Sequence, residues 1–440
     1  MSFDLPALPD GWVFSPLEGC AAPGSISYGV VQPGAPSVHG IPMIRVNNFR
    51  DMRLDLSDVM RVAPEVEAKY ARTRLSGGEV LLTLVGSVGQ VAEVPPSCAG
   101  FNVARAVGVI KPANGIDSRW IAICLRSPLS QHLLGTRANT TVQTTINLKD
   151  VRALPIPIPP LAERSQIADF ISALDERIAL LRKTNATLEA IAQALFKSWF
   201  VDFDPVRAKQ EGLAPTGMDE ATAALFSDGF ENSPLGSIPK GWRAAKIGEV
   251  CSLGRGSSPR PIQEYMGNDI PWIKIADATA SDGMFVLTTK EKIKREGVAK
   301  SVAVRNGDLI MSNSASCGIP VFVELEGCIH DGWLYFQGFS AVSKNLMFYW
   351  LRHISAHLVR IADGSVQKNL NIGLVSAQSI ICPPPSVPRA FDAVVQPLLD
   401  RIRDNCQQAQ TLAALRDTLL PRLISGQLRL PEAETLSALA

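Results

Sequence analysis

Hydrophobic residues over positions 167–199 recur at alternating spacings of four and three. This 3.5-residue period predicts a long helix that packs against another helix along a narrow apolar seam. The seam consists of Ile167, Ile171, Leu174, Ile178, Leu181, Asn185, Leu188, Ala192, Leu195 and Trp199. A shift of 224 residues gives a second seam, at Phe391, Val395, Leu398, Ile402, Asn405, Ala409, Leu412, Arg416, Leu419 and Leu423. Pro397 and Pro421 lie in this second segment and are expected to kink or end its helix.

The two helices can pack antiparallel so that the numbers of facing residues sum to 590. The facing pairs are then Ile178 with Leu412, Leu188 with Ile402, Trp199 with Phe391, and Asn185 with Asn405. Two amides facing each other in an apolar seam would satisfy one another and fix the register, at some cost in stability. The alternative is that both amides tilt toward solvent. Leu174 would face Arg416, and we expect the seam to fray at that mismatch.

Shorter runs rich in β-branched and aromatic residues predict strands separated by Gly-rich turns. They cover residues 42–46, 79–85 and 105–110 in the first half, and 271–275, 308–313 and 333–339 in the second. Residues 119–135 and 344–362 have the hydrophobic spacing of short helices. Each half is therefore expected to contain an α+β domain followed by one of the long helices.

The two halves repeat one another in order. Residues 40–46 match residues 269–275, and residues 78–89 match residues 307–318, both with a shift of 229. Further along, Val142, Gln143 and Asn147 match Val366, Gln367 and Asn371 with a shift of 224. Small drifts of this kind are what loop insertions produce, so the chain is expected to be an internal repeat.

The resulting fold class is α+β, with two similar globular domains joined by two long antiparallel, coiled-coil-like helices in a pseudo-two-fold arrangement. The expected boundaries are 1–160 for the first domain, 161–203 for its helix, 204–237 for a linker, 238–385 for the second domain, 386–426 for its helix and 427–440 for a C-terminal tail. The first helical seam would span roughly 48 Å at about 1.5 Å per residue. Two-fold readers of duplex DNA contact half-sites about 34–36 Å apart, so DNA is the obvious ligand for such a rod.

Composition changes this picture only slightly. The chain is 46% hydrophobic and 19% charged, as in globular proteins, and its net charge of +1 is weak support for a nucleic-acid binder. Phosphate contacts need only local basic patches, however. No apolar run is long enough to span a membrane, the N-terminus has no secretory signal, and the eight cysteines show no metal-ligand spacing. A cytoplasmic protein with reduced thiols is expected.

The helical segments carry a family resemblance. Residues 156–209, which begin "IPIPPLAERSQIADF", resemble the central conserved region of type I restriction-modification specificity subunits. Residues 371–428 resemble their distal conserved region. The segments "GEVLLTLVGSVG" and "GDLIMSNSASCG" look like the Gly-rich strand-turn of their target recognition domains.

This resemblance implies a non-catalytic subunit in which each target recognition domain reads one half of a split, asymmetric double-stranded DNA target. Two methyltransferase subunits would dock on it, and restriction subunits would join them. S-adenosylmethionine, ATP and Mg would bind to those partners, with no cofactor or metal on this chain. The chain contains neither a Gly-rich phosphate loop followed by Lys-Ser/Thr nor a methyltransferase signature.

Candidate DNA contacts occur at matching places in the repeat. Arg45, Asn47, Asn48 and Arg50 follow a predicted strand, as does Lys274 in the second half, and Ser87 lies in a Gly-rich turn. Arg, Lys and Asn have the geometry to read base edges in the major groove. Residues 290–300 carry five basic and two acidic side chains, so Lys290, Lys292, Lys294 and Arg295 are candidate phosphate contacts.

Three alternatives remain open. The Glu67-x-Lys69 pattern resembles part of a nuclease site, but a solvated helix face is the expected role. The chain as a whole could be an orphan specificity protein. It could also be a repeat-built scaffold that binds proteins and no DNA.

Overall fold

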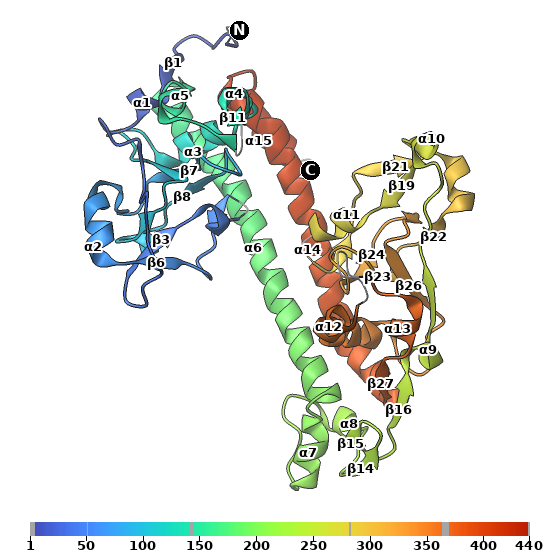
Figure 1. Cartoon of the computed structure of the whole chain (residues 1–440). Helices are drawn as coiled ribbons and strands as arrows, with labels where there is room; N and C mark the ends of the chain where they lie inside the picture. Colours follow the sequence, from blue (N-terminus) through green and yellow to red (C-terminus); the bar gives the residue numbers. More distant parts are fainter. Residues whose placement is uncertain (1–4, 51, 141–143, 281–282, 363–368, 439–440) are drawn as a thin grey trace. The chain divides into compact units, whose positions relative to one another are not determined.

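The computed structural model describes residues 5–50, 52–140, 144–280, 283–362 and 369–438 (Figure 1). The repeat matches at Val142, Gln143, Val366 and Gln367 lie outside these residues. The chain divides into two compact units, one of residues 1–178 with 410–440 and one of residues 179–409. Two long helices, α6 (Leu161–Phe200) and α14 (Ser386–Ile424), each contribute a part to both units. Among the described residues, no helix is both long and apolar enough to cross a bilayer.

Unit 1 is built around two small sheets. The four-stranded sheet has the order β2-β10-β7-β8 and the three-stranded sheet the order β6-β3-β9, and β1 pairs with β13. Their bounds are β1 Val13–Pro16, β2 Ser27–Tyr28, β3 Ile41–Ile44, β6 Met60–Val62, β7 Val80–Thr83, β8 Val91–Glu93, β9 Asn102–Val103, β10 Val107–Ile110 and β13 Pro155–Ile158. Two hairpins join β4 Phe49–Arg50 to β5 Arg53–Leu54 and β11 Asn139–Thr140 to β12 Thr144–Thr145.

Helices cover this framework. The α-helices of unit 1 are α1 Leu17–Cys20, α2 Pro64–Glu67, α3 Ser118–Arg126, α4 Pro128–Arg137, α5 Leu148–Arg152 and α15 Leu430–Ala438, and its 3-10 helices are η1 Val46–Asn48, η2 Ala68–Thr73 and η3 Pro96–Cys98. One apolar core joins the apolar face of α3 to strands β7 and β8 and to the unit 1 parts of α6 and α14. The globular domain of unit 1 is therefore anchored to the helix pair within its own unit.

Unit 2 repeats the design with larger sheets. Two five-stranded sheets have the orders β17-β26-β23-β24-β20 and β18-β21-β19-β25-β22, and β16 pairs with β27. The strands are β16 Arg243–Lys246, β17 Ser252–Arg255, β18 Met266–Gly267, β19 Ile270–Ile273, β20 Phe285–Val286, β21 Glu291–Ile293, β22 Val302–Val304, β23 Leu309–Ser312, β24 Pro320–Val323, β25 Gly327–Ile329, β26 Trp333–Gln337 and β27 Ser379–Cys382. The helices are α9 Ile247–Val250, α10 Ile262–Tyr265, α11 Ile275–Ala280, η4 Arg295–Lys300, α12 Lys344–Ile361 and α13 Ile372–Ser376.

Strand pairing confirms the repeat. Strand β3 pairs antiparallel with β6 and parallel with β9, and its counterpart β19 pairs antiparallel with β21 and parallel with β25. All six predicted strand segments contain a strand, and the two predicted short helices are α3–α4 and α12. The shift of 229 residues also holds in detail, because Val80 faces Glu93 on β8 and Leu309 faces Phe322 on β24.

The predicted linker, residues 204–237, forms elements of its own. It contains α7 (Asp204–Gln210), α8 (Glu220–Ala223) and most of the hairpin β14 (Phe230–Ser233) to β15 (Gly236–Pro239). Its side chains Val206 and Phe226 are buried in the same core as Trp199 and Trp242. This segment therefore closes the end of the unit 2 core.

The helix pair is antiparallel in each unit. In unit 2 the rings of Trp199 and Phe391 lie 5.9 Å apart, and Asn185 contacts Asn405 further along. In unit 1 Asp175 on α6 pairs with Arg416 on α14 at 2.8 Å. Because residue numbers rise along one helix as they fall along the other, the two helices run in opposite directions within each unit.

The predicted fraying at Arg416 is wrong. Leu174 is buried, and Arg416 turns its guanidinium to Asp175, which also accepts from Arg126 at 2.8 Å. All three charged side chains are less than one fifth exposed. Two cations sharing one carboxylate satisfy its charge, so the arginine joins the seam at a small polar network instead of opening it.

The two prolines do not end α14, which continues to Ile424. Each proline frees the carbonyl four residues earlier, at Ala393 and Asp417, and both of those residues are exposed, so water can satisfy the freed oxygen. Val395 and Leu399 are buried on either side of Pro397, and their packing holds the helix together.

Candidate nucleic-acid interface

The loop after β3 is held from beneath by Asn48. The Asn48 Oδ1 accepts from the Arg45 backbone N–H at 2.9 Å, and its Nδ2 donates to the carbonyls of Asp55 (3.0 Å) and Asp58 (2.9 Å). Asn48 is only 2% exposed. It therefore braces the loop, and its amide is not available to a base edge.

The second unit braces the equivalent loop with a carboxylate. Asp277 accepts from the backbone N–H groups of Lys274 (2.8 Å) and Lys290 (3.0 Å), and it is buried. Here the partners are two N–H donors, whereas the loop in unit 1 presents one N–H donor and two carbonyl acceptors. Each side chain thus matches the polarity of the backbone groups around it.

A second loop, between β7 and β8, is built alike in both units. The Thr83 hydroxyl donates to the Ser87 carbonyl and accepts from the Gln90 N–H at 2.9 Å. In unit 2 the Ser312 hydroxyl donates to the Ser316 carbonyl at 2.6 Å and accepts from the Ile319 N–H at 3.0 Å. The turn needs a left-handed residue, which is Gly86 in unit 1 (φ 78°) and Ala315 in unit 2 (φ 54°). Gly86 therefore serves the turn, because glycine adopts a left-handed conformation without strain.

The two loops of unit 1 meet at a shallow concavity. Its lining residues are Arg45, Val46, Asn47, Phe49, Ser87, Gln90, Ala104 and Ala106. Three of the predicted DNA contacts, Arg45, Asn47 and Ser87, are thus brought together. Arg45 pairs with Asp58 at 3.4 Å, but Asp58 is 83% exposed, and an ion pair of that kind contributes less than about 1 kcal/mol. A nucleic-acid phosphate or base could displace it.

Arg50 lies outside the concavity, on the hairpin of β4 and β5. Its register partner across the hairpin is Arg53, and both residues are exposed. Like charges facing each other across two strands are unfavourable unless an anion lies nearby. This pair is suited to contacts with the DNA backbone.

In unit 2 the predicted basic residues separate into two kinds. Lys274 is already engaged, because its Nζ lies 2.6 Å from Glu291 and 5.0 Å from the centre of the Trp272 ring. Lys290, Lys292, Lys294 and Arg295 are all exposed on β21 and the residues that flank it. Of these four side chains, only that of Lys294 donates to a carbonyl of the described residues, that of Glu264, at 2.8 Å. These four exposed basic side chains stay candidates for contacts with phosphate.

Sequence reasoning missed three polar side chains at these surfaces. Gln90 lines the concavity, and Arg105 is exposed between the lining residues Ala104 and Ala106. In unit 2, Arg260 pairs with Asp331 at 3.2 Å and is 79% exposed. Arg105 is the first residue of a predicted strand and Gln90 directly follows the "GSVG" turn, so position at a strand end was the available signal.

The Glu67-x-Lys69 pattern does not form a solvated helix face, so that expectation is wrong for Glu67. Its side chain is 1% exposed, accepts from Arg74 Nε at 2.9 Å and accepts from Asn102 Nδ2 at 2.9 Å. The hydrogen bond from Arg74 lowers the pKa of Glu67. Glu67 closes the domain core and is not positioned for nuclease chemistry.

The helix-pair residues are placed as follows. Asn405 Nδ2 donates to Asn185 Oδ1 at 2.8 Å, and Asn185 Nδ2 lies 3.3 Å from the Ile402 carbonyl and 3.2 Å from Cys406 Sγ. Both amides are buried, and neither tilts to solvent. Leu188 packs against the core that contains Ile402, while Ile178 is buried and Leu412 half-buried.

Comparisons with known proteins show the family to which the chain is similar. The sequence profile of the type I restriction modification DNA specificity domain matches the chain twice, at residues 37–190 and 239–388. The chain is similar to the type I restriction enzyme MjaIX specificity subunit of Methanocaldococcus jannaschii, with 25% identity over 81% of this chain and 78% of that protein. It is also similar to the HindI specificity subunit of Haemophilus influenzae, with 27% identity over 67% of this chain and 72% of that protein.

The fold has a solved counterpart. A crystal structure of the type I restriction-modification system S subunit from M. genitalium aligns with a TM-score of 0.55 and 14% identity, covering 96% of this chain and 97% of that one. At that identity the likeness concerns the fold alone. The two profile matches together span most of the residues, and the chain therefore belongs to the family of type I restriction-modification DNA specificity proteins.

Proposed function

We propose that this specificity protein reads a split, asymmetric sequence in double-stranded DNA, with one recognition domain for each half-site. The observation that carries the proposal is a shared frame of paired strands and braced loops with different side chains at its matching positions. Arg45, Asn47 and Gln90 of unit 1 correspond to Lys274, Ala276 and Ile319 of unit 2 under the shift of 229. Two copies of one frame that present different groups are suited to reading different bases.

Phosphate contacts would position each domain on the duplex. The exposed Arg50 and Arg53 in unit 1 and the exposed Lys290, Lys292, Lys294 and Arg295 in unit 2 supply them. Such contacts add affinity without reading sequence, and they make binding sensitive to salt. The near-neutral net charge is compatible with this proposal because the basic residues are gathered locally.

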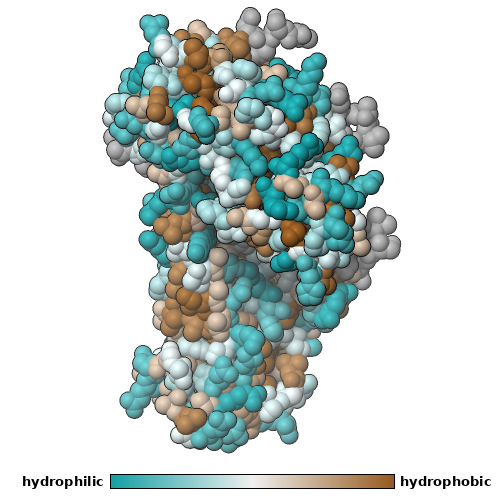
Figure 2. All heavy atoms as spheres, turned by 90° about the vertical axis from the view of Figure 1, so that its left-hand side faces the viewer, coloured by the Kyte–Doolittle hydropathy of each residue, from teal (hydrophilic) through white to brown (hydrophobic). Residues whose placement is uncertain are grey.

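The helix pair would determine the number of base pairs between the half-sites and receive the partner subunits. Large apolar side chains are exposed on it, namely Leu161, Leu180 and Ile191 of α6 and Val394 of α14. Figure 2 shows that hydrophobic residues also gather in patches on the face of the molecule drawn there. Exposed apolar patches on a protein of this kind mark interaction sites.

We infer that the partners are two methyltransferase subunits and the restriction subunits of a type I enzyme. S-adenosylmethionine, ATP and Mg would bind to those subunits, and this chain would contribute no catalytic group. The names of its relatives support this assignment, because they are specificity subunits of type I restriction enzymes. The family match does not favour a scaffold without DNA binding.

A salt titration tests the DNA role. The chain, alone and with its methyltransferase partner, is mixed with a pool of duplexes at several salt concentrations. We expect binding that weakens steeply with salt, and a slope that falls when exposed arginines or lysines are removed. Absence of salt-dependent binding in both conditions would contradict the proposal.

A further inference from the structure

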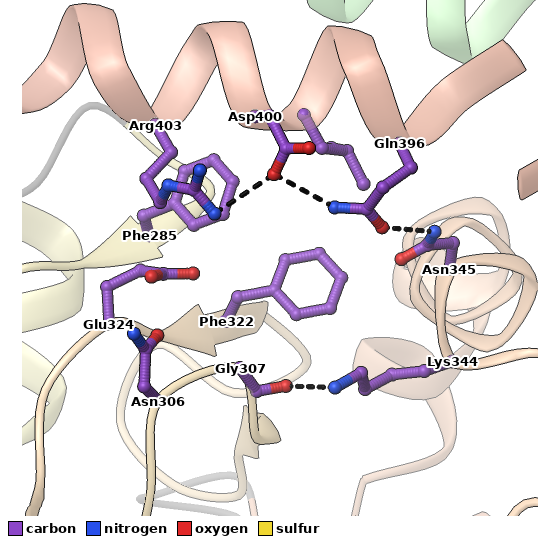
Figure 3. Close-up of a pocket in the computed structure, with 11 residues that line it drawn as sticks. Phe285, Asn306, Gly307, Phe322, Glu324, Lys344, Asn345, Gln396, Asp400 and Arg403 are labelled. Carbon is purple, nitrogen blue, oxygen red and sulfur yellow. Dashed lines mark hydrogen bonds and ion pairs between the residues drawn. The ribbon is translucent and has the colours of Figure 1, made fainter. Parts of the chain in front are cut away.

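A pocket in unit 2 lies where the second recognition domain meets α14 (Figure 3). It is lined by Phe285, Asn306, Gly307, Phe322, Glu324, Lys344, Asn345, Gln396, Leu399, Asp400 and Arg403. Strands β20 and β24 supply the two phenylalanines, the start of α12 supplies Lys344 and Asn345, and α14 forms the opposite wall. None of these residues is among the predicted DNA contacts.

Most of the polar groups in this pocket are already paired. Arg403 lies 3.0 Å from Asp400, which accepts from Gln396 at 3.1 Å, and Gln396 accepts in turn from Asn345 at 2.9 Å. On the other side, Lys344 donates to the Gly307 carbonyl. Both cations of the lining are therefore committed, and the α14 wall is a closed chain of hydrogen bonds.

Among the charged side chains of the lining, Glu324 is the exception. No hydrogen bond or ion pair joins its carboxylate to any described residue, and Figure 3 shows the carboxylate directed beside Phe322 toward the middle of the pocket. Burial raises its pKa, and Asp400 and Asp404 raise it further, while Arg403 and Lys344 act in the opposite direction. A partly buried carboxylate without a partner is costly, and a bound cation would remove that cost.

The floor of the pocket suits the apolar part of such a cation. The rings of Phe285 and Phe322 lie 5.8 Å apart in a stacked arrangement, and Phe322 stacks on Phe348 at 4.5 Å. Aromatic faces attract ammonium and guanidinium groups and also accept alkyl chains. Anions are disfavoured, since both cations of the lining are occupied and two carboxylates face the space.

The corresponding corner of unit 1 is closed. Glu93 stands where unit 2 has Phe322, and the Ser118 hydroxyl donates to it at 3.1 Å. Arg119 is likewise paired, with Asp117 and Asp169, both at 2.6 Å. The unpartnered carboxylate over an aromatic floor is thus a feature of unit 2 alone in the described repeat.

We propose that this pocket binds an alkyl ammonium or alkyl guanidinium group, with Glu324 as its counter-ion and Phe322 beneath it. The group could belong to a small organic amine in solution or to a lysine or arginine side chain of a partner subunit. The site is separate from the DNA contacts, so its test does not depend on the DNA role.

The test uses the full chain and n-butylguanidinium as the probe, with uncharged n-butylurea as its match in shape. Binding is followed by saturation-transfer NMR. We expect a signal for the guanidinium that exceeds that of the urea, and at least a tenfold weaker affinity in Glu324→Gln. Glu326→Gln, a change at the exposed acid two residues away, should bind like the unaltered chain. Equal signals for the two probes, or an unchanged affinity in Glu324→Gln, would overturn the proposal.

A second arm identifies the source of the group. The probe is offered again to the chain assembled with its methyltransferase partner. If the complex no longer binds the probe and Glu324→Gln assembles more weakly with the partner, the pocket holds a side chain of the partner subunit. If the complex still binds the probe, the pocket takes a free amine. Circular dichroism of Glu324→Gln checks folding, which should persist because the change removes an unpaired charge.

Discussion

The loop after β3 in unit 1 and the loop after β19 in unit 2 occupy matching places in the repeat, but different buried side chains support them. Asn48 in unit 1 meets one N–H donor and two carbonyl acceptors, and Asp277 in unit 2 meets two N–H donors. The repeat therefore constrains the shape of the loop and leaves the chemistry of its support free to change. A buried side chain is acceptable there only if it complements the backbone groups around it.

The cores beneath the loops differ in the same way. Asn102 of β9 belongs to a buried polar network with Glu67 and Thr73. Cys328 of β25, the equivalent strand, packs in an apolar cluster with Trp272 and Ile293. The polar side chains of the unit 1 network bond to one another, whereas the buried indole N–H of Trp272 in unit 2 has no hydrogen-bond partner among the described residues. The same strand frame is therefore retained over two different cores.

The largest effect is expected when Asn48 of unit 1 is replaced by aspartate, the residue type that unit 2 has at the equivalent position. Asn48→Asp places a buried carboxylate against the carbonyls of Asp55 and Asp58, and we expect it to lower the free energy of unfolding by about 3–5 kcal/mol. The measurement is chemical denaturation of the full chain. The neighbouring exposed change Asn47→Asp should stay within about 0.5 kcal/mol. Similar values for the two variants would contradict the bracing role.

Removing the charge of Glu67 should weaken unit 1 in a pH-dependent way. The pKa of Glu67 is lowered by the hydrogen bond from Arg74, so its stabilisation is present above the unfolded pKa and is lost as pH falls through the folded value. Glu67→Gln should cost about 1.5–3 kcal/mol at neutral pH and less in acid. Denaturation curves of both forms at pH 7 and pH 3 measure this, and a constant difference would count against it.

The seam offers a comparison between a polar and an apolar pair. Under the shift of 224 residues, Asn185 corresponds to Ala409 and Asn405 corresponds to Leu181. The repeat therefore contains the polar pair once and an apolar pair at the symmetric place. Asn185→Leu leaves Asn405 buried without its partner and should cost about 1–3 kcal/mol. The double change to Leu should recover most of that loss while loosening the register. Additive effects of the two single changes, read from a double-mutant cycle, would refute the pairing.

A smaller effect is expected at the left-handed turn residues. Gly86→Ala should destabilise by about 1 kcal/mol, because a Cβ is unfavourable at positive φ. Ala315→Gly should stabilise by roughly 0.5 kcal/mol, since relief of strain exceeds the entropy that glycine adds to the unfolded chain. Thermal denaturation of the two variants should therefore give shifts of opposite sign. Shifts in the same direction would show that the two turns are not equivalent.

The smallest effect concerns phosphate contacts. Arg50→Ala should weaken DNA binding about equally for all sequences and reduce the slope of log K against log salt by about 1. Gln90→Ala should instead relax specificity at one position and leave the slope unchanged. Binding titrations on matched duplexes separate the two outcomes, and a slope change in Gln90→Ala would reverse the assignment.

Much of the fold was predictable from hydrophobic periodicity. The seam and the six strand segments follow from the spacing of hydrophobic residues along the chain. The antiparallel direction came from pairing facing residues of the two seams, with Asn185 opposite Asn405. The roles of Arg416 and Glu67 were not predictable, because each depends on partners distant in sequence, Asp175 in one case and Asn102 in the other. The site was predicted only in part. Arg45 and Asn47, selected at a strand end, and Ser87, selected in a Gly-rich turn, line one concavity, and their contacts with DNA stay a prediction. No local pattern distinguished the buried Asn48 from the exposed Asn47.

The central claim is that two copies of one frame read different half-sites, and sequencing of the methylated motif in cells tests it most directly. Cells carrying this chain with its methyltransferase partner should show an asymmetric motif of two parts separated by unspecified bases. With Gln90→Ala, the part read by unit 1 should become relaxed and the other part should stay the same. An uninterrupted or palindromic motif, or relaxation of both parts together, would contradict the account.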